Sequence, residues 1–384
     1  MSTKKKILVF TDWYEPGFKA GGPIQSCRNF VAAMGDPFEL AILTSDRDLG
    51  DLQPYPGVVT NEWTRTKDGH ARIWYSATEK LTPATIRRLT DLVAPDYIYL
   101  NSLYSYRFTL IPLWLKFRGK LSGNVVIAPR GMLHAGALQF KSAKKKFFIK
   151  VLNAMGLPRK LVFHATDEQE RKDIARYFPT AQKIAVLPNF PKMEAVEWKP
   201  LSKRPGELRC VFISRLAPKK NLLFLLTLLK QFPKDNILRL TLRGDIEDRN
   251  YWEKCLAAID ELPSHISVSY EGPVPNEAVM SVLQQHHLFV LPTLGENFGH
   301  AIFEAFLAGL PVLISDKTPW RELQQKKTGI DLPLESTAFD HGLRNFAAMD
   351  QETYNEWSGA AFEYAKTIQR DGSLKEAYKK NLFS

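Results

Sequence analysis

The sequence contains very little cysteine. Its 384 residues include only three, Cys27, Cys210 and Cys255, which lie far apart and lack the short spacing of a metal-binding pair. Scattered cysteines of this kind predict neither a disulfide framework nor a zinc site, and they fit a reducing compartment.

A long hydrophobic run near the start is also lacking. Lys4, Lys5 and Lys6 precede the short apolar run 7–10, and Asp12 then interrupts it. The run is far shorter than a signal-peptide core or a membrane-spanning helix. We therefore expect a cytoplasmic protein.

Acidic residues are missing between Asp96 and Asp167. This interval carries a charge of +12, against +11 for the whole chain, so the remainder is close to neutral. Its basic residues are Arg107, Lys116, Arg118, Lys120, Arg130, Lys141, Lys144, Lys145, Lys146, Lys150, Arg159 and Lys160. We expect one surface of the N-terminal half to be strongly positive.

What the sequence does contain is a regular alternation of short β-rich runs and helix-length segments. This pattern predicts an α/β protein with parallel sheets and crossover helices, and the length predicts two Rossmann-like domains. The expected strands are 7–11, 40–44, 97–100, 125–128 and 161–164 in the first domain, and 210–214, 238–242, 266–270, 288–291 and 312–315 in the second.

A proline-punctuated segment separates the two series of strands. We assign residues 1–190 to an N-terminal acceptor-binding domain, 191–205 to a linker and 206–352 to a C-terminal donor-binding domain. Residues 353–384 form a helical segment that is expected to return to the first domain.

The loop after the expected strand 288–291 carries the most informative motif. It reads Pro-Thr-Leu-Gly-Glu296-Asn-Phe-Gly-His-Ala-Ile-Phe-Glu304, with a helix expected to begin near Gly299. Ligands of open α/β sheets bind beyond the carboxyl ends of the strands, and a helix start favours phosphate or electron-rich sugar oxygens. Glu296 and Glu304 would accept hydrogen bonds from sugar and ribose hydroxyls. Ordinary helix capping is the alternative for either glutamate alone.

Two further loops suit an anionic ligand. Arg215-Leu-Ala-Pro-Lys-Lys220-Asn follows the first strand of the second domain and places a cation on each side of a short turn, where both can reach one diphosphate. Gly21 and Gly22 follow the first strand of the chain and precede a helix, so backbone N–H groups can approach a ligand there. A solvated basic turn and a plain glycine turn are the alternatives.

Taken together, these residues resemble the large retaining GT-B glycosyltransferase group usually numbered four, the glycosyl transferases group 1. The family hallmark is a pair of glutamates separated by seven residues in a Glu-x-Phe-Gly context, which 296–304 reproduces. The Arg-Leu-x-Pro-x-Lys-Asn string at 215–221, the early double glycine and Leu187-Pro-Asn189 match as well. The resemblance implies two Rossmann-like domains that face each other across a cleft, with a C-terminal helix packing back on the first.

The resemblance also implies a role for each site residue. Arg215 and Lys220 would neutralise the departing diphosphate, Glu296 would hold the transferred sugar and Glu304 the ribose. The other residues that it implies are Gly21 and Gly22 at the diphosphate, and Asn297, Phe298, Gly299 and His300 around the sugar and phosphate. The histidine that family members use in the first domain is replaced in 128–134 by Arg130, with His134 one helical turn later, and either is a candidate contact for the donor sugar.

The activity implied is a retaining, hexosyltransferase-type transfer from a nucleotide sugar to a glycan or lipid-linked acceptor, as in the assembly of cell-surface polysaccharides. In the family the leaving phosphate takes the acceptor proton, so no protein nucleophile is expected. We expect no cofactor and no metal, because the two cations supply the positive charge. Asp46-Arg-Asp48 matches the Asp-x-Asp pattern of metal-dependent sugar transferases, but we expect a solvated loop there.

Two alternatives come from other classes of protein. A nucleotide-sugar epimerase or hydrolase on the same fold would need a general base or activated water, for which His134 and His300 are the nearby candidates. A non-catalytic nucleic-acid or membrane binder is suggested by charge alone and leaves the glutamate and Arg/Lys motifs unexplained. Nucleic acid is therefore not an expected partner.

The interval without acidic residues includes a possible amphipathic helix. Its apolar residues recur at helical spacing, with most lysines off that stripe. The apolar set is Phe140, Ala143, Phe147, Phe148, Val151, Leu152 and Met155. A core-facing helix with a solvated basic side is one reading. Peripheral binding to an anionic membrane on the inner face of the cell, with a lipid-linked acceptor, is the other.

Overall fold

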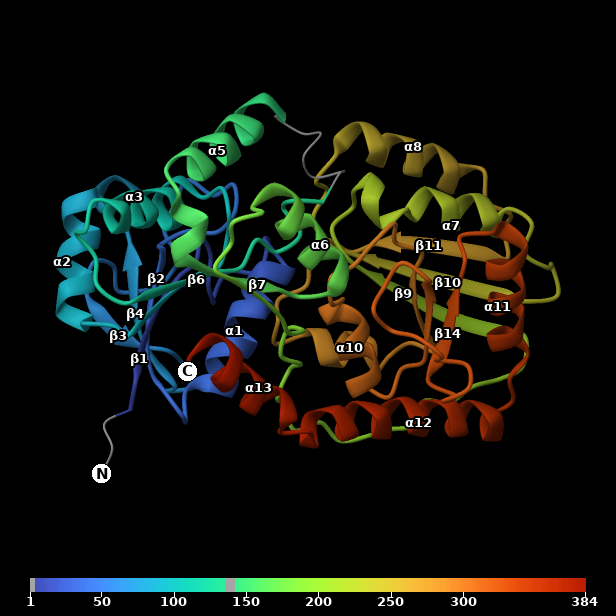
Figure 1. Cartoon of the computed structure of the whole chain (residues 1–384). Helices are drawn as coiled ribbons and strands as arrows, with labels where there is room; N and C mark the ends of the chain where they lie inside the picture. Colours follow the sequence, from blue (N-terminus) through green and yellow to red (C-terminus); the bar gives the residue numbers. More distant parts are fainter. Residues whose placement is uncertain (1–3, 135–141) are drawn as a thin grey trace. The chain divides into compact units, whose positions relative to one another are not determined.

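A computed structural model describes residues 4–134 and 142–384 and divides the chain into two compact units (Figure 1). Unit 1 comprises Met1–Met193 together with Gly372–Ser384, and unit 2 comprises Glu194–Asp371. Each unit is an α/β domain built on one sheet, which confirms the predicted fold class. The chain first passes from unit 1 to unit 2 at 193–194. The surrounding residues 187–204 form neither helix nor strand.

The sheet of unit 1 has the strand order β3-β4-β2-β1-β5-β6-β7-β8 and is parallel except for the pairing of β3 with β4. The strands are β1 (Lys6–Phe10), β2 (Glu39–Ser45), β3 (Trp63–Arg65), β4 (Ala71–Ser76), β5 (Tyr97–Leu100), β6 (Asn124–Ile127), β7 (Leu161–Ala165) and β8 (Lys183–Val186). The five predicted strands are present, and β3, β4 and β8 were not predicted.

Helices cover both faces of this sheet. The helical segments are α1 (Gly22–Met34), η1 (Thr78–Lys80), α2 (Pro83–Val93), η2 (Tyr106–Leu110), α3 (Ile111–Phe117), α5 (Ser142–Ala154), η3 (Leu157–Lys160), α6 (Glu168–Tyr177) and α13 (Ser373–Leu382). Leu8 and Phe10 of β1 pack in a core with residues of α2, α3, α5 and α6, whereas Ile7 and Val9 pack with residues of α1 and α13. This alternation follows from the two-residue period of a strand and explains why β1 is apolar throughout.

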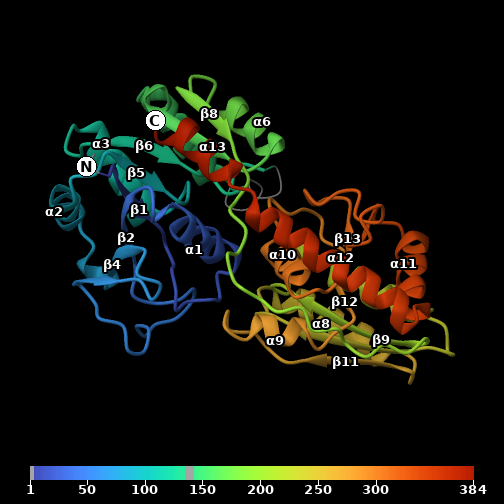
Figure 2. The ribbon, with the colours of Figure 1, turned by 90° about the horizontal axis from the view of Figure 1, so that it is seen from below.

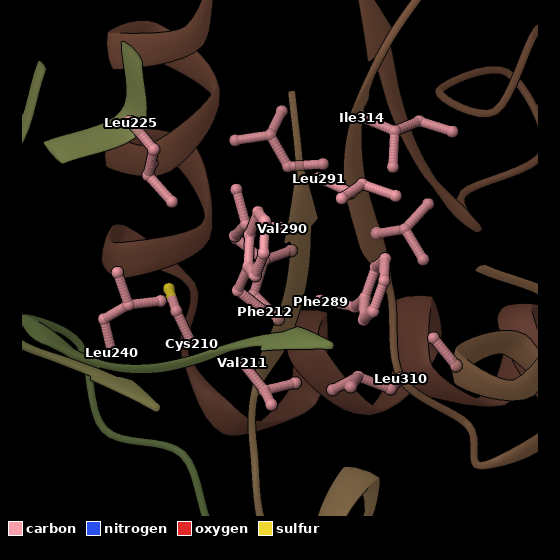
Figure 3. Packing of buried hydrophobic residues seen from close by; sticks show 14 of the residues in the cluster. Cys210, Val211, Phe212, Leu225, Leu240, Phe289, Val290, Leu291, Leu310 and Ile314 are labelled. Carbon is pink, nitrogen blue, oxygen red and sulfur yellow. The ribbon is translucent and has the colours of Figure 1, made fainter. Parts of the chain in front are cut away.

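The sheet of unit 2 is fully parallel, with the order β11-β10-β9-β12-β13-β14. Its elements are β9 (Glu207–Ile213), η4 (Pro218–Lys220), α7 (Leu222–Leu229), β10 (Ile237–Arg243), α8 (Arg249–Asp260), β11 (Ile266–Tyr270), α9 (Val279–Leu283), β12 (Leu288–Leu291), α10 (His300–Leu307), β13 (Val312–Ser315), β14 (Gly329–Leu332), α11 (Ser336–Ala348) and α12 (Gln351–Arg370). The five predicted strands are again present, and β14 is additional. Figure 3 shows side chains of β9, β10, β12 and β13 packed together with Leu225 of α7.

The order of the strands in unit 2 reverses between β9 and β12. From β9 the chain builds outward through β10 to β11, and from β12 it builds in the opposite direction through β13 to β14. The connections after β9 and β12 therefore leave the same edge of the sheet and diverge, which is the usual place for a ligand in an open α/β sheet.

The C-terminal segment serves both units. Tyr354, Ala361 and Ala365 of α12 belong to the core of unit 2, whereas Tyr378, Leu382 and Phe383 belong to the core of unit 1. Figure 2 shows α12 and α13 as successive helices of this segment. The expected return to the first domain is thus made by 372–384 and not by the whole of 353–384, because the buried side chains of α12 pack on α10.

Helix α5 differs from the expected apolar stripe. Phe147 is 70% exposed, while Ile149, which was not assigned to the stripe, is 6% exposed. Leu152 is buried as expected, and Phe148 and Met155 are half-buried against the core. Phe140 and Lys141 lie outside the described residues.

Candidate functional site

The loop that carries Glu296 is fixed by a fully buried threonine. Thr293 follows β12, and its Oγ1 accepts a hydrogen bond from the backbone N–H of Gly295 at 3.2 Å. The same hydroxyl lies 3.2 Å from Oε1 of Glu296 and 3.2 Å from the backbone oxygen of Lys219, which follows β9. The N–H of Glu296 donates to the backbone oxygen of Lys317, after β13, at 3.0 Å. Loops after three adjacent strands therefore position the Glu296 carboxylate.

Lys220 forms an ion pair with Glu296 at the switch point of unit 2, where the strand order reverses between β9 and β12. The two side chains are 15% and 14% exposed, so the pair is largely shielded from solvent. Lys220 ends the short helix η4, and Asn221 follows in the left-handed conformation with φ 59° before α7 begins. The turn that was predicted between Arg215 and Asn221 thus places Lys220 next to the loop after β12, the strand beside β9.

Arg215 is held in a different way. Its guanidinium forms an ion pair with Glu247, which lies in the loop after β10, and both side chains are more than 40% exposed. Exposed pairs contribute little to stability, so Arg215 can exchange this partner at small cost. Lys219, the third cation of the turn, is exposed.

The start of α10 lies directly after Glu296. Gly299 is the residue before the helix, with φ 78°, a conformation that favours glycine. The backbone oxygen of Phe298 accepts a hydrogen bond from Trp320 Nε1 at 2.5 Å, and the Phe298 ring lies between those of Trp320 and His300. Asn297 and His300 are half-buried, and Glu304, one turn inside α10, is 5% exposed. These contacts fix the backbone whose N–H groups begin the helix.

In unit 1 the glycine turn begins α1. Gly21 has φ 63° and precedes the helix, and its backbone oxygen accepts from the N–H groups of Ile24 and Gln25. A Cβ added at Gly21 or Gly22 would meet no atom within 4 Å. The structure therefore places these glycines where no neighbour within the chain requires a small residue.

Arg130 belongs to a polar network inside unit 1. Its Nε donates to Asn101 Oδ1 at 2.8 Å, one terminal nitrogen donates to the Tyr99 hydroxyl at 2.8 Å, and the other donates to Asn189. The Tyr99 hydroxyl lies 2.7 Å from Nδ1 of His164, whose Nε2 lies 2.8 Å from the backbone oxygen of Leu187. Burial, reinforced by the Arg130 charge, lowers the pKa of His164 to about 3, so the ring is neutral and links Tyr99 to Leu187.

His134 is paired with an acidic residue instead. Its Nδ1 lies 2.5 Å from Oδ2 of Asp173 on α6, and the imidazole is 26% exposed. Nearby, the buried carboxylate of Glu170 accepts hydrogen bonds from the N–H of Gly131 at 2.6 Å and from the N–H and hydroxyl of Thr166, both at 2.7 Å. Helix α6 therefore fixes both ends of 131–134.

Asp46 and Asp48 are not solvated, contrary to the prediction. They lie in a loop after β2 as expected, but they are only 1% and 5% exposed. Arg47 Nε donates to Asp46 at 2.8 Å, and backbone N–H groups of Phe18 and Lys19 donate to Asp48. Hydrogen bonding to the protein, which the sequence pattern does not reveal, compensates the burial of these charges.

Residues 196–361 match the family described as Glycosyl transferases group 1. The matched segment contains Arg215, Lys220, Glu296 and Glu304, together with the switch point of the second sheet. Family and fold together support a glycosyltransferase. A comparison with curated proteins found none that matches.

Solved structures of glycosyltransferases extend the likeness to the whole chain. Sucrose-phosphate synthase from Thermosynechococcus elongatus is 15% identical with a TM-score of 0.68, over 98% of both chains. HepE of Anabaena, in complex with UDP and glucose, is 14% identical with a TM-score of 0.69, over 98% of this chain and 99% of its own. WaaG, a glycosyltransferase involved in lipopolysaccharide biosynthesis, is 13% identical with a TM-score of 0.59, over 99% and 100%. The chain therefore has the GT-B fold.

Several residues around the site could not be found by motif. Thr293, Glu247 and Asp173 contact Glu296, Arg215 and His134. Thr293 stands in the quoted loop but was given no role, and Glu247 and Asp173 lie far from their partners in sequence. The signal that was available is positional, since Thr293 and Glu247 follow strands β12 and β10 at the edge where ligands bind.

Metal-binding and membrane-spanning features were also sought in the described ranges, 4–134 and 142–384. No group of three or more histidine, cysteine or acidic side chains in these ranges could hold a metal ion. None of the helices described combines the length and the apolar character needed to cross a bilayer.

Proposed function

We propose that the protein is a retaining glycosyltransferase that moves a hexose from a nucleotide sugar to a glycan or lipid-linked acceptor. The observation that carries this proposal is the convergence of Lys220 and Glu296 at the switch point of unit 2, beside the start of α10. A cation, a carboxylate and a helix start at one sheet edge suit a ligand that has both phosphate and hydroxyl groups.

The two cations would act on the diphosphate. Arg215 and Lys220 each form an ion pair with a carboxylate. A bound diphosphate would replace part of these contacts and become a partner of both cations. Lys220 would then stabilise the charge that develops on the leaving phosphate, while Glu296 would accept hydrogen bonds from sugar hydroxyls. Catalysis of this kind rests on positioning and electrostatic stabilisation and needs no protein nucleophile.

Of the two candidates in 128–134, we propose His134 in preference to Arg130 as a contact for a sugar hydroxyl. Arg130 donates to three fixed partners, so little of its hydrogen-bonding capacity remains. The His134 imidazole makes one hydrogen bond, through Nδ1 to Asp173, and within the described residues its Nε2 has no partner. Asp173 would fix the tautomer that presents this nitrogen to a hydroxyl.

The donor is the first point to test. HepE was solved with UDP and with UDP-glucose, which makes these the first probes. A thermal-shift screen of nucleotides and nucleotide sugars should single out one base, since a ligand at 100 times its Kd stabilises the protein by about 2.7 kcal/mol. If no nucleotide or nucleotide sugar shifts the melting temperature, the proposed donor site is wrong.

The two glutamates should then separate the nucleotide from the sugar. Glu304→Gln is expected to weaken binding of the selected nucleoside diphosphate by about 10-fold or more, because a charge-assisted hydrogen bond to the ribose is lost. Glu296→Gln should chiefly affect binding or reaction of the sugar. Isothermal titration calorimetry with the nucleoside diphosphate alone measures the difference, and equal weakening by both changes would contradict the assignment.

Other reactions on the same fold predict different products. An epimerase or hydrolase would release an epimer or free sugar from the nucleotide sugar without any acceptor, whereas the proposed transferase would form a glycoside. A nucleic-acid binder would be retained on DNA with a steep dependence on salt.

We further propose that unit 1 binds an anionic membrane surface. Its basic interval also carries exposed aromatic side chains on η2, α3 and α5, which a charged solvent-facing surface does not need. They are Tyr106, Trp114, Phe117 and Phe147, with exposed fractions between 47% and 70%. Basic residues contribute about 1 kcal/mol each near anionic lipid, and aromatic side chains insert at the interface.

Liposome co-sedimentation tests this surface. The protein should pellet with anionic but not with neutral vesicles at low salt, and a Lys144/Lys145/Lys146→Glu variant should stay in solution. Phe147→Ser should weaken pelleting, whereas Leu256→Ser, which changes an exposed apolar residue of unit 2, should not. If the unaltered protein ignores anionic vesicles at low salt, the membrane proposal fails.

A further inference from the structure

The hydroxyl of Thr293 has more acceptors within reach than it has protons. Its Oγ1 lies 3.2 Å from the backbone oxygen of Lys219, 3.3 Å from that of Gly295 and 3.2 Å from Oε1 of Glu296. The same Oγ1 accepts a hydrogen bond from the N–H of Gly295 at 3.2 Å. A hydroxyl group has one proton, so it donates to one of these three oxygens at a time.

The surroundings of Thr293 allow its hydroxyl to change acceptor. Thr293 is fully buried, and its backbone oxygen accepts from the Ser315 hydroxyl at 2.5 Å. The backbone oxygen of Lys219 also accepts from the N–H of Leu294 at 2.8 Å, so it keeps a partner when the hydroxyl turns away from it. Rotation of the O–H bond alone therefore redirects the hydrogen bond to Glu296, and the proton stays on the threonine.

The Glu296 carboxylate is anchored through one of its oxygens. Oε1 forms the ion pair with Lys220 and lies beside the Thr293 hydroxyl, whereas among residues 4–134 and 142–384 Oε2 has no partner. The side chain is only 14% exposed, so a charged Oε1 needs a donor from the protein. Two donors are in place for this one oxygen, a cation and a hydroxyl.

We propose that Thr293 is a positioning residue that takes over Oε1 of Glu296 when the donor diphosphate draws Lys220 away. In the proposed function, on which this inference rests, a bound diphosphate replaces part of the contact between Lys220 and Glu296. The Thr293 hydroxyl then holds the carboxylate in place, and Oε2 stays available to a sugar hydroxyl. All the residues concerned belong to unit 2.

Thr318 provides a matched control in the same unit. Its Oγ1 accepts from the N–H of Trp320, two residues further along the chain, at 3.2 Å, just as Thr293 accepts from Gly295. Thr318 is 5% exposed and follows the neighbouring strand β13. Within the described parts of the chain, its hydroxyl otherwise contacts only the backbone oxygen of Trp320. Thr318→Val therefore removes the same kind of turn contact without touching a carboxylate.

The first measurement needs no ligand. Thr293→Val keeps the shape of the side chain and removes the hydroxyl, and Lys220→Ala removes the cation. If both groups serve Oε1, the double variant leaves this oxygen without a donor, so its melting temperature should fall by more than the two single decreases together. Thr318→Val combined with Lys220→Ala should be additive. Additive decreases in both double variants would overturn the inference.

The second measurement uses the nucleotide sugar that gives the largest thermal shift. Thr293→Val should lower the kcat for release of the nucleoside diphosphate by about 10- to 100-fold, as for a lost hydrogen bond to a charged group, and should leave the Kd of the free nucleoside diphosphate within about 3-fold. Thr293→Ser keeps the hydroxyl and should retain most of the kcat. Thr318→Val should change neither quantity.

Three kinetic results would also overturn the inference. They are an unchanged kcat in folded Thr293→Val, an equal loss in Thr293→Ser, and an equal loss of affinity for the nucleoside diphosphate, which would indicate a general distortion of the loop. Circular dichroism checks folding, and Thr293→Ala makes the same comparisons if Thr293→Val does not fold. Absence of turnover with every nucleotide sugar rejects the proposed function and this inference with it, whereas additive melting temperatures reject the role of Thr293 alone.

Discussion

Lys220 and Arg215 carry the same charge but have different surroundings. Lys220 is 15% exposed and faces Glu296 beside the buried Thr293, whereas Arg215 is 41% exposed and faces Glu247. Loss of Lys220 would leave a partly buried carboxylate without its cation, and loss of Arg215 would leave a solvated one. The same substitution should therefore have different effects on stability at the two positions.

Alanine variants test the part of both cations in the reaction. Arg215→Ala and Lys220→Ala should each lower kcat by about 100-fold or more, by analogy with the loss of one donor to a developing negative charge. Lys220→Ala should also lower the melting temperature, and Arg215→Ala should not. Steady-state kinetics and differential scanning calorimetry measure both quantities.

Glu247→Gln is the matched control for Arg215. It removes the partner seen in this structure and keeps the guanidinium, so kcat should fall much less than in Arg215→Ala. Near-normal kcat in both alanine variants would remove the cations from the mechanism.

At the residue scale, the sequence assigned side chains to the donor site but did not predict the contacts that hold them. Lys220 and Glu296 were both assigned to the donor, although 75 residues lie between them, because each belongs to its own motif after a strand. Their contact depends on β9 and β12 being neighbours, and local sequence does not encode the order of strands. The same limitation explains why the burial of Asp46 and Asp48 was missed.

At the scale of elements, α13 completes unit 1 through one aromatic residue. The Tyr378 ring packs with Phe190, at 4.3 Å between ring centroids, and with Phe30 and His164, and its hydroxyl donates to the backbone oxygen of Pro188 at 2.9 Å. This bond ties the last helix to the segment just before the crossing at 193–194.

Tyr378→Phe removes this hydrogen bond and keeps the packing. The free energy of unfolding of unit 1 should fall by about 1 kcal/mol, because a partly buried hydrogen bond is lost. Tyr364→Phe in α12 is the control, since the Tyr364 hydroxyl makes no hydrogen bond with the described residues and this change should alter stability by less than about 0.5 kcal/mol. Urea unfolding compares the two, and an equal effect would contradict the role assigned to Tyr378.

Strands with several apolar residues were the predictable elements. Nine of the ten predicted strands are found within one residue of their predicted bounds, and β9 begins three residues before its predicted start. Three of the four missed strands lie at sheet edges: β3 has three residues, β8 has only one buried residue, and β14 contains glycine and aspartate. In α5 the expected apolar stripe was wrong at Phe147, which is exposed. Helical spacing identifies the buried face only when the apolar residues are buried.

At the scale of the whole molecule, each unit contains a buried neutral histidine. His164 in unit 1 and His287 in unit 2 are fully buried, and burial lowers their pKa values to about 3 and about 4. His287 Nδ1 accepts from the N–H of Arg209 at 3.1 Å, so its proton lies on Nε2, 2.9 Å from the oxygen of Ser202. Protonation of either ring would bury a positive charge, and in His287 it would also break the hydrogen bond that Nδ1 accepts from Arg209.

Both units should therefore lose stability in mild acid. The unfolded chain takes up protons at these histidines as the pH falls through about 6.5, whereas the folded state does not until the pH approaches its lowered pKa. Stability is present above pH 6.5 and falls below it, by about 2 kcal/mol for each histidine at pH 5. Urea unfolding at pH 7, 6 and 5 measures the slope.

Glutamine variants assign the slope to these residues. His287→Gln should flatten the pH dependence of unit 2 and His164→Gln that of unit 1, while His341→Gln, at an exposed position, should leave both unchanged. Identical slopes in all three variants would mean that other groups cause the acid sensitivity.

The return of 372–384 to unit 1 has a consequence for synthesis on the ribosome. Unit 2 is continuous in sequence and can close its core once residue 371 has emerged, whereas unit 1 has to wait for Tyr378, Leu382 and Phe383. At about 5–20 residues per second, the apolar face formed by Ile7, Val9 and Phe30 stays uncovered while the whole of unit 2 is translated. The domain that is made first is finished last, and until 372–384 have emerged it is the part of the nascent protein that chaperones and proteases would recognise.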